Sequence, residues 1–170
     1  YITTEDVGMT PEDLVHIAQE TPHVLGLPTS LGGSGDTSEQ TGWGVYLGMK
    51  ACAKAAWGSD SLEGRVVGIQ GFGNVATYTV SHLLEEGVEI VATDINEDAL
   101  DRARDLGARV VGVEEIYDVE CDIFSPCALG SSLNGETIPR LRCTVVAGGA
   151  NNQLASEEHG VELQRRDILY

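Results

Sequence analysis

The sequence predicts an α/β protein with a doubly wound parallel sheet and helices on both of its faces. The main observation is that short apolar runs alternate with helical stretches from residue 65 onward. The runs are continuously apolar, as expected of strands buried on both faces, and parallel strands need helical crossovers between them. Six such runs fit a sheet of order 3-2-1-4-5-6.

Each element follows from a local pattern. Thr10 and Pro11 predict the start of a helix that reaches about Glu20, because threonine caps helices and proline suits the first turn. A long helix is expected over 41–57, where three glycines each lower helix propensity by about 1 kcal/mol. That cost predicts close approach of another backbone or a ligand. Strands are expected at 65–70, 88–93, 108–111, 121–125, 144–147 and from 168, and later helices at 75–86, 97–106, 136–141 and 157–165.

The stretch "GIQGFGNVA" carries the spacing G-x-G-x-x-A between the first strand and its helix. Gly71 permits a tight turn, Gly73 lets a pyrophosphate approach bare backbone, and Ala76 keeps the helix close to the strand. The helix N-terminus adds free N–H groups and a partial positive charge. The pattern predicts a Rossmann-like dinucleotide site whose cofactor-binding residues are Gly71, Phe72, Gly73, Asn74, Val75 and Ala76.

Asp94 ends the second strand, 23 residues after Gly71. A carboxylate there can accept the ribose hydroxyls of NAD, and it would repel a 2′-phosphate by roughly 4 kcal/mol per unit charge at 4 Å and an effective dielectric near 20. Because no Arg or Lys occurs in the next seven residues, NAD is favoured over NADP. Two alternatives remain: a purely structural turn with a solvent-facing aspartate, and an S-adenosylmethionine site.

Composition limits the other function classes. The chain has 27 acidic against 10 basic residues, a net charge of −17, which disfavours nucleic acid and anionic membranes as partners. No apolar run approaches the roughly 18 residues that cross a bilayer. The four cysteines lack metal-ligand spacing and predict buried thiols, no metal site and a cytoplasmic location.

Five collinear stretches together resemble the leucine/phenylalanine/valine dehydrogenases: "TTEDVGMT", "SLEGRVVGIQGFGNVA", "VATDIN", "CDIFSPCALG" and "AGGANNQL". The resemblance implies reversible oxidative deamination of a branched-chain or aromatic L-amino acid to the 2-oxo acid, with NAD reduced. It also implies a homo-oligomeric full-length enzyme with a further N-terminal domain that supplies two catalytic lysines. Residues 1–170 are then expected to form the NAD-binding domain, with 1–60 as an interdomain lead-in, and to be inactive alone.

The same resemblance assigns further site residues. Asp6 matches the catalytic aspartate that exchanges protons with the substrate amine. Asn151 is placed beside the nicotinamide and substrate, Cys127 and Ala128 near the nicotinamide ribose, and Thr41 at the nicotinamide amide. Around Thr41 the sequence "SGDTSEQTGWGVY" departs from the family's usual S-G-N-P-S-P-x-T-A-x-G-V at Asp36, Glu39 and Gly42.

Two function hypotheses of different classes therefore stand. One is the cofactor-binding domain of an amino-acid dehydrogenase, and the other is a stand-alone NAD-binding module without catalysis. Asp6 and Asn151 favour the enzyme, because a pure binding module needs neither.

Overall fold

The computed structural model describes residues 1–6 and 8–170. Residue 7, which belongs to the "TTEDVGMT" stretch, lies outside the described residues. The chain forms two compact units, residues 1–40 and 41–170, which are described separately. The helices and strands are α1 (Pro11–Ala18), η1 (Thr29–Leu31), α2 (Ser38–Trp57), β1 (Val66–Gln70), α3 (Asn74–Glu85), β2 (Glu89–Thr93), α4 (Glu97–Asp105), β3 (Arg109–Val110), η2 (Glu115–Asp118), β4 (Ile123–Pro126), η3 (Ile138–Arg140), β5 (Val145–Val146) and α5 (Glu157–Arg165).

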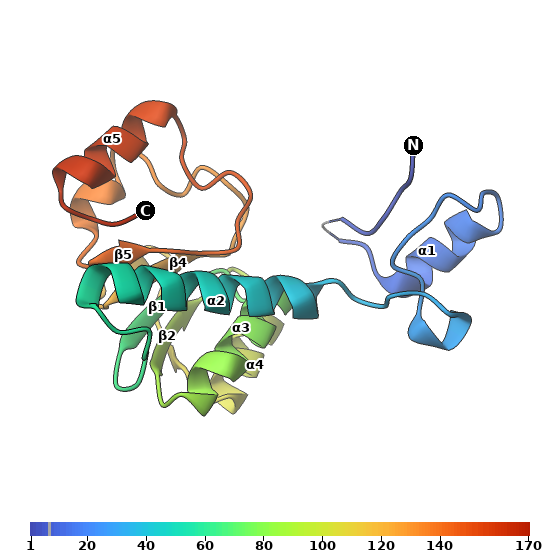
Figure 1. The fold of residues 1–170 in the computed structure, drawn as a ribbon, viewed down its shortest axis with the longest axis horizontal. Coiled ribbons are helices and arrows are strands. Elements are labelled where there is room, and N and C mark those ends of the chain that lie inside the picture. The colour runs from blue at the N-terminus through green and yellow to red at the C-terminus, as the bar shows by residue number, and fades with distance from the viewer. Residues whose placement is uncertain (7) are drawn as a thin grey trace. The chain divides into compact units, whose positions relative to one another are not determined.

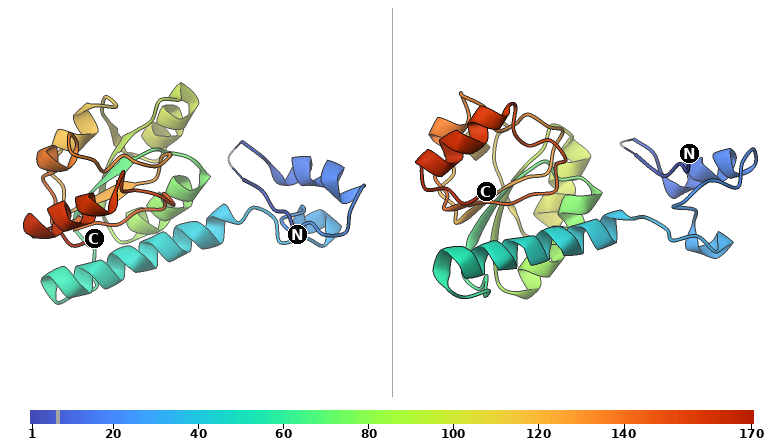
Figure 2. Two further views of the ribbon diagram at one scale, coloured as in Figure 1. Left: turned by 90° about the horizontal axis from the view of Figure 1, so that it is seen from above. Right: turned by 45° about the horizontal axis from the view of Figure 1, so that its top comes forward.

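The second unit is built on a parallel five-stranded sheet of order β3-β2-β1-β4-β5. Helices α2, α3 and α4 lie on one side of the sheet, and α5 lies on the other (Figures 1 and 2). The predicted doubly wound α/β fold is thus confirmed. The chain reverses direction across the sheet between β1 and β4, and the strand ends at such a switch point form a crevice suited to ligands.

Alternate residues of the strands enter two separate cores, because side chains along a strand point to opposite faces. Ile123 and Val145 pack with α2, α3 and α4, whereas their neighbours Phe124 and Val146 pack with η2, η3 and α5. All four side chains are at most 2% exposed. Burial on both faces explains why the strands read as unbroken apolar runs in the sequence.

Helix α2 approaches α3 closely at Gly42. A Cβ on Gly42 would lie 2.7 Å from the Cβ of Tyr78 and 3.0 Å from the Val75 oxygen, and the Thr79 hydroxyl donates to the Gly42 oxygen at 3.2 Å. Further along, an ion pair between Lys50 and Glu86 joins the two helices. The predicted close approach of a backbone is therefore found at Gly42.

The unit of residues 1–40 contains α1, η1 and a parallel bridge between Thr3 and Val24. Helix α1 begins as predicted: the Thr10 hydroxyl accepts from the Asp13 N–H at 3.3 Å, and the Asp13 carboxylate accepts from the Thr10 N–H at 2.8 Å. Leu14 is fully buried within this unit.

Several elements are shorter than predicted: β3 and β5 span 109–110 and 145–146 instead of 108–111 and 144–147, and two further elements change in kind. The expected helix 136–141 is only the 3-10 turn η3: the N–H groups of Arg140 and Leu141 donate three residues back, to the Thr137 and Ile138 oxygens, and Pro139 has no N–H to continue an α-helical ladder. The expected sixth strand is a single parallel bridge between Val145 and Leu169. Its position beside β5 still agrees with the predicted order.

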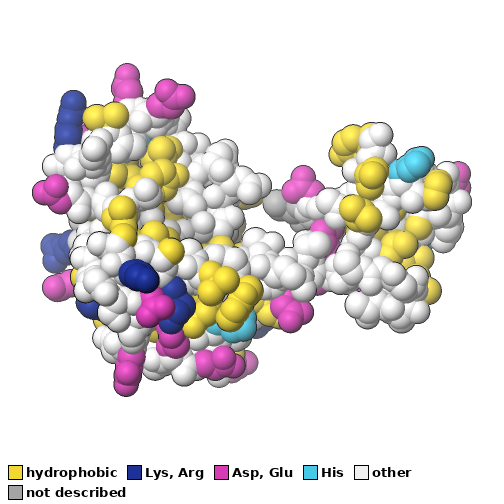
Figure 3. Space-filling model, in the orientation of Figure 1, with side chains coloured by type: hydrophobic (Ala, Val, Ile, Leu, Met, Phe, Trp, Pro, Cys, Tyr) yellow, Lys and Arg dark blue, Asp and Glu magenta, His cyan; other side chains and the backbone are white. Residues whose placement is uncertain are grey.

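In the part of the chain that the structure describes, no helix has the length and hydrophobicity needed to cross a bilayer. Acidic side chains are spread over the visible face, and hydrophobic side chains gather over part of α2 (Figure 3).

Candidate cofactor site

Three loops meet at the carboxyl ends of the central strands. The loop after β4 is tied to β1 through the Cys127 N–H, which donates to the Gln70 oxygen at 2.8 Å. The loop after β5 is tied to β4 through the Ala150 N–H, which donates to the Pro126 oxygen at 3.0 Å. These bonds bring the glycine motif and the later strand ends, distant in sequence, to one edge of the sheet.

Gly71 is required at the start of the first loop by both its conformation and its neighbours. Its φ of +93° lies in the left-handed region that side chains disfavour. A Cβ there would also lie 2.5 Å from the Ala128 nitrogen and 2.7 Å from its Cα. The tight turn predicted for Gly71 therefore also lets the loops after β1 and β4 touch.

Gly73 faces open space instead. It is the N-cap of α3, and within 4 Å of a Cβ built on it there is no atom of the described residues beyond its chain neighbours. Its φ of −79° is accessible to any residue, so the backbone does not require glycine here. What the missing side chain provides is free space above the backbone. No described side chain caps α3, which leaves N–H groups of its first turn available to an anion.

Asp94 connects the end of β2 to the glycine loop. One carboxylate oxygen accepts the Phe72 N–H at 2.6 Å, and the other accepts the Asn96 N–H at 2.8 Å. Each carboxylate oxygen has two lone pairs, so both can still accept a hydroxyl. The acid is therefore held beside the glycine loop, where a ribose hydroxyl of a dinucleotide needs an acceptor.

Arg102 is a site residue that the sequence interpretation missed. It lies on α4, eight residues after Asp94, and its guanidinium donates to the Phe72 oxygen at 3.4 Å. It forms no ion pair with the described residues, unlike its neighbour Arg104, which pairs with Glu97 and Asp101. Arg102 lies one position beyond the seven that contain no basic residue, and α4 brings its guanidinium back to the glycine loop.

The other residues of the motif divide into core and surface. The side chains of Phe72 and Ala76 are 0% and 1% exposed and belong to the hydrophobic core, so only their backbone can contact a ligand. Asn74 is exposed at the first turn of α3. Val75 is half-buried, and its side chain would lie 3.0 Å from a Cβ on Gly149.

Cys127 turns its thiol inward. Its sulfur lies 3.4 Å from the Ser125 hydroxyl. Burial raises the pKa of the Cys127 thiol above its ordinary value. The residue therefore supports the loop contact and is poorly suited to act as a nucleophile.

A cavity of about 580 Å³ lies between α2 and the end of β5. Thr41 and the two exposed glycines of α2, Gly44 and Gly48, line it from one side, and Gly149 and Gln153 line it from the other. Asn151 is exposed in the same loop after β5. The structure thus brings Thr41 close to the loop of Asn151, although the roles assigned to both remain predictions.

Asp6 belongs to the unit of residues 1–40 and is exposed. Its backbone oxygen accepts the Met9 N–H at 3.0 Å, which places it in a turn before α1. Its catalytic role remains a prediction.

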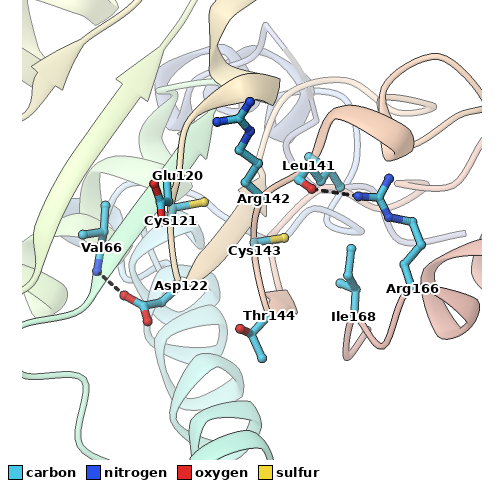
Figure 4. A pocket seen from close by; sticks show the side chains of 10 residues that line it. All are labelled: Val66, Glu120, Cys121, Asp122, Leu141, Arg142, Cys143, Thr144, Arg166 and Ile168. Carbon is cyan, nitrogen blue, oxygen red and sulfur yellow. Dashed lines mark hydrogen bonds between the residues drawn. The ribbon is translucent and has the colours of Figure 1, made fainter.

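A second cavity, of about 640 Å³, lies at the opposite edge, around the amino ends of β1, β4 and β5. Its two thiols, Cys121 and Cys143, project to the same side (Figure 4). The Arg166 guanidinium donates to the Leu141 oxygen at 3.0 Å and to the Ile138 oxygen, while Asp122 accepts from Arg65 at 2.7 Å. Its charged groups are largely engaged in holding the fold, and among the described residues no cluster of potential metal ligands was found.

The fold and this edge fit a dinucleotide. The space above Gly73, the uncapped N-terminus of α3 and the acid at the end of β2 are the features that a pyrophosphate and a ribose require. Metal-independent anchoring by backbone N–H groups also explains how so acidic a chain could hold a diphosphate.

Comparison with known proteins gives the same family as the sequence motifs. The model of the Glutamate/Leucine/Phenylalanine/Valine dehydrogenase family matches residues 32–102. Leucine dehydrogenase of Thermoactinomyces intermedius is 54% identical over all of this chain and 47% of its own length. Phenylalanine dehydrogenase of the same organism is 44% identical over all of this chain and 47% of its own length.

A solved structure is similar to this chain in both fold and sequence. L-tryptophan dehydrogenase from Nostoc punctiforme superposes with a TM-score of 0.80 and 40% identity, over 99% of this chain and 48% of its own. The chain spans about half the length of the curated relatives it matches. In motifs, fold and sequence, this chain is similar along its whole length to members of the glutamate/leucine/phenylalanine/valine dehydrogenase family.

Proposed function

We propose that this chain is the NAD-binding part of an amino-acid dehydrogenase that interconverts a branched-chain or aromatic L-amino acid and its 2-oxo acid. Leucine, phenylalanine and tryptophan dehydrogenases among its relatives support the reaction class. The observation that carries the cofactor proposal is the arrangement of Gly73, the open N-terminus of α3 and Asp94 at one strand edge.

Each site residue has a distinct task. The first-turn N–H groups of α3 bind the pyrophosphate, and Asp94 accepts the adenosine ribose hydroxyls. A bound NAD would supply hydride-transfer chemistry for the substrate α-carbon. Thr41, Cys127, Ala128 and Asn151 line the nicotinamide end, and Asp6 holds and returns the proton of the substrate amine.

The proposal includes a branched-chain or aromatic L-amino acid as the substrate and a homo-oligomeric full-length enzyme. Lys50 pairs with Glu86 on the outer side of α2, and we assign no catalytic role to it. The two catalytic lysines implied by the family are expected from a domain beyond these 170 residues. The chain alone should therefore bind the cofactor without turning over amino acids, because most substrate positioning is missing.

Cofactor binding is tested by titrating the chain with NAD in a calorimeter and comparing it with Gly73→Val. The branched side chain would occupy the open space above the backbone, so binding should be lost while circular dichroism remains that of the parent. Gly135→Ala, at an exposed turn before η3 whose backbone is not left-handed, serves as a control glycine substitution outside the site. Undiminished binding by Gly73→Val would contradict the pyrophosphate assignment.

The catalytic proposal is tested in the native full-length protein with Asp6→Asn. Loss of a general acid–base group typically costs about 10²–10⁴-fold, so kcat should fall by that order while NAD affinity stays unchanged. A native protein that binds NAD but oxidises none of leucine, valine, phenylalanine or tryptophan would favour the alternative of a non-catalytic NAD-binding module.

A further inference from the structure

We propose that Gln153 is a positioning residue of the cofactor site. Its side-chain amide fixes the turn at 148–152 so that the Asn151 backbone N–H faces the ligand. The inference rests on the proposed function, because it concerns the same site, but it assigns a task to a side chain that the sequence motifs leave without one.

The Gln153 amide closes a ring across the turn. Its nitrogen donates to the Gly148 oxygen at 2.8 Å and to the Ala150 oxygen at 3.1 Å. A carboxamide nitrogen carries two hydrogens, so this one side chain can satisfy both carbonyls at once. The two contacts fix the peptide planes that follow Gly148 and Ala150.

The base of this clamp is itself anchored. The backbone oxygen of Gln153 accepts the N–H of Leu133, a fully buried residue, at 2.9 Å. The rest of the turn is held by backbone bonds: the Ala150 N–H donates to the Pro126 oxygen at 3.0 Å, and the Ser131 N–H donates to the Asn152 oxygen at 2.7 Å. The side-chain hydrogen bonds described for this turn come from Gln153, and the others join backbone groups.

The clamp determines where the Asn151 N–H points. In a trans peptide the C=O and the next N–H lie on opposite sides, and the described residues contain no cis peptide. Because the Ala150 oxygen is turned toward Gln153, the Asn151 N–H is turned away from it. In the described part of the chain this N–H forms no hydrogen bond, and it remains a donor for an oxygen of the bound nicotinamide half.

This orientation has a cost that a purely space-filling residue would avoid. The Gln153 Oε1 is buried and has no hydrogen-bond partner among the described residues. A buried acceptor without a partner is destabilising, whereas leucine at the same place would leave no such group. The contribution of the amide to this turn is therefore its pair of donors.

The test compares Gln153→Leu and Gln153→Glu in calorimetric titrations with NAD at pH 8.0 and 5.5. Both substitutions remove the amide donors, so both should bind NAD about tenfold more weakly at pH 8.0. At pH 5.5 the Gln153→Glu carboxyl is partly protonated, because it faces two carbonyl oxygens that disfavour its charged form. Its O–H can then donate to one of them, and its affinity should recover at least threefold relative to Gln153→Leu.

Ser156→Ala is the matched control. It removes the cap of α5, formed by Ser156 and His159 at 3.0 Å, and should lower thermal stability without changing NAD affinity. Amide NMR of the free chain gives a readout independent of binding: both Gln153 variants should lower the order parameters of residues 149–151, and Ser156→Ala should not.

The outcomes separate the two proposals. A parent chain that binds no NAD overturns the proposed function and with it the role of the turn. A parent that binds, with Gln153 variants of equal affinity, overturns only the positioning role. Equal weakening of both variants with no recovery at pH 5.5 also overturns it, since loss of packing alone would produce that result.

Discussion

The side chains of Asp94 and Arg102, which carry opposite charges, both bind the backbone of Phe72 in the glycine loop. Asp94 accepts the Phe72 N–H at 2.6 Å, and Arg102 donates to the Phe72 oxygen at 3.4 Å. An acid at this place favours NAD, whereas an arginine near it can hold the 2′-phosphate of NADP. We therefore expect the preference for NAD to depend on Asp94 while a positive partner for NADP is already in place.

The residue-scale prediction is that Asp94→Ser changes the cofactor preference. NAD affinity should fall about tenfold or more with the loss of a charged hydrogen bond, worth about 1.5–3 kcal/mol. NADP affinity should rise at least tenfold, because the repulsion of the 2′-phosphate disappears. Fluorescence titrations with NADH and NADPH measure both effects.

Double variants locate the source of the gain. Adding Arg102→Ala to Asp94→Ser should remove most of the increase in NADPH affinity, and adding Arg104→Ala should leave it intact. Arg104 is the matched control because it lies on the same helix but pairs with Glu97 and Asp101. Equal NADPH affinity of the two double variants would show that Arg102 does not contact the phosphate.

At the scale of elements, the glycines of α2 serve different purposes despite their common cost to helix propensity. Gly42 is buried against α3, whereas Gly44 and Gly48 have no atom within 4 Å of a built Cβ and line the cavity beside Gln153. The helix therefore combines one site of close packing with a smooth surface facing a cavity.

At the scale of this helix, we expect alanine substitutions at Gly48 and Gly42 to change the free energy of unfolding in opposite directions. Gly48→Ala should stabilise the fold by about 0.5–1 kcal/mol, because alanine restricts the unfolded chain and finds free space. Gly42→Ala should destabilise it by about 1–3 kcal/mol, because its Cβ would lie 2.7 Å from that of Tyr78. Urea unfolding of the two variants checks the pair, and a loss of stability with Gly48→Ala would contradict the interpretation of that surface as open.

At the scale of the whole molecule, the buried thiols couple stability to alkaline pH. Burial raises the pKa of the Cys121 thiol to about 12 and that of the Cys143 thiol to about 11, from an ordinary value of 9.0. In the unfolded chain these thiols lose their protons at lower pH, so above pH 9 the folded state binds more protons. The stability that these two protonated thiols contribute is thus fully present below about pH 9. It declines as the pH rises toward their pKa values in the folded state.

The whole-molecule prediction is a loss of up to about 1.4 kcal/mol per pH unit for each thiol between pH 9 and 11. The double variant Cys121→Ala, Cys143→Ala should start from lower stability at pH 7.5, because the core loses volume, but its pH dependence between 9 and 10 should be much shallower. Urea unfolding at pH 7.5, 9 and 10 gives the slopes. An equally steep decline in the double variant would assign the alkaline sensitivity to other groups.

Much of the molecule was predictable because its signals are local. The unbroken apolar runs determine buried parallel strands, and Thr10, Pro11 and Asp13 determine the start of α1 through contacts three residues apart. The strand–glycine–helix motif and the acid at the end of β2 likewise lie within a single βαβ unit, so their chemistry could be inferred from spacing. The predicted helix at 136–141 forms only a 3-10 turn, because Pro139 lacks the N–H that an α-helical ladder needs.

The tertiary structure alone decided which distant groups meet. The contact of Gly71 with Ala128, the reach of Arg102 back to Phe72 and the clamp of Gln153 on its turn all depend on how strand ends and helix faces are brought together. Side-chain directions and loop closures of this kind leave no period or spacing in a sequence, because their energy comes from packing between segments. The sequence by itself thus determined the fold class and the kind of ligand edge, and packing decided which side chains orient that edge.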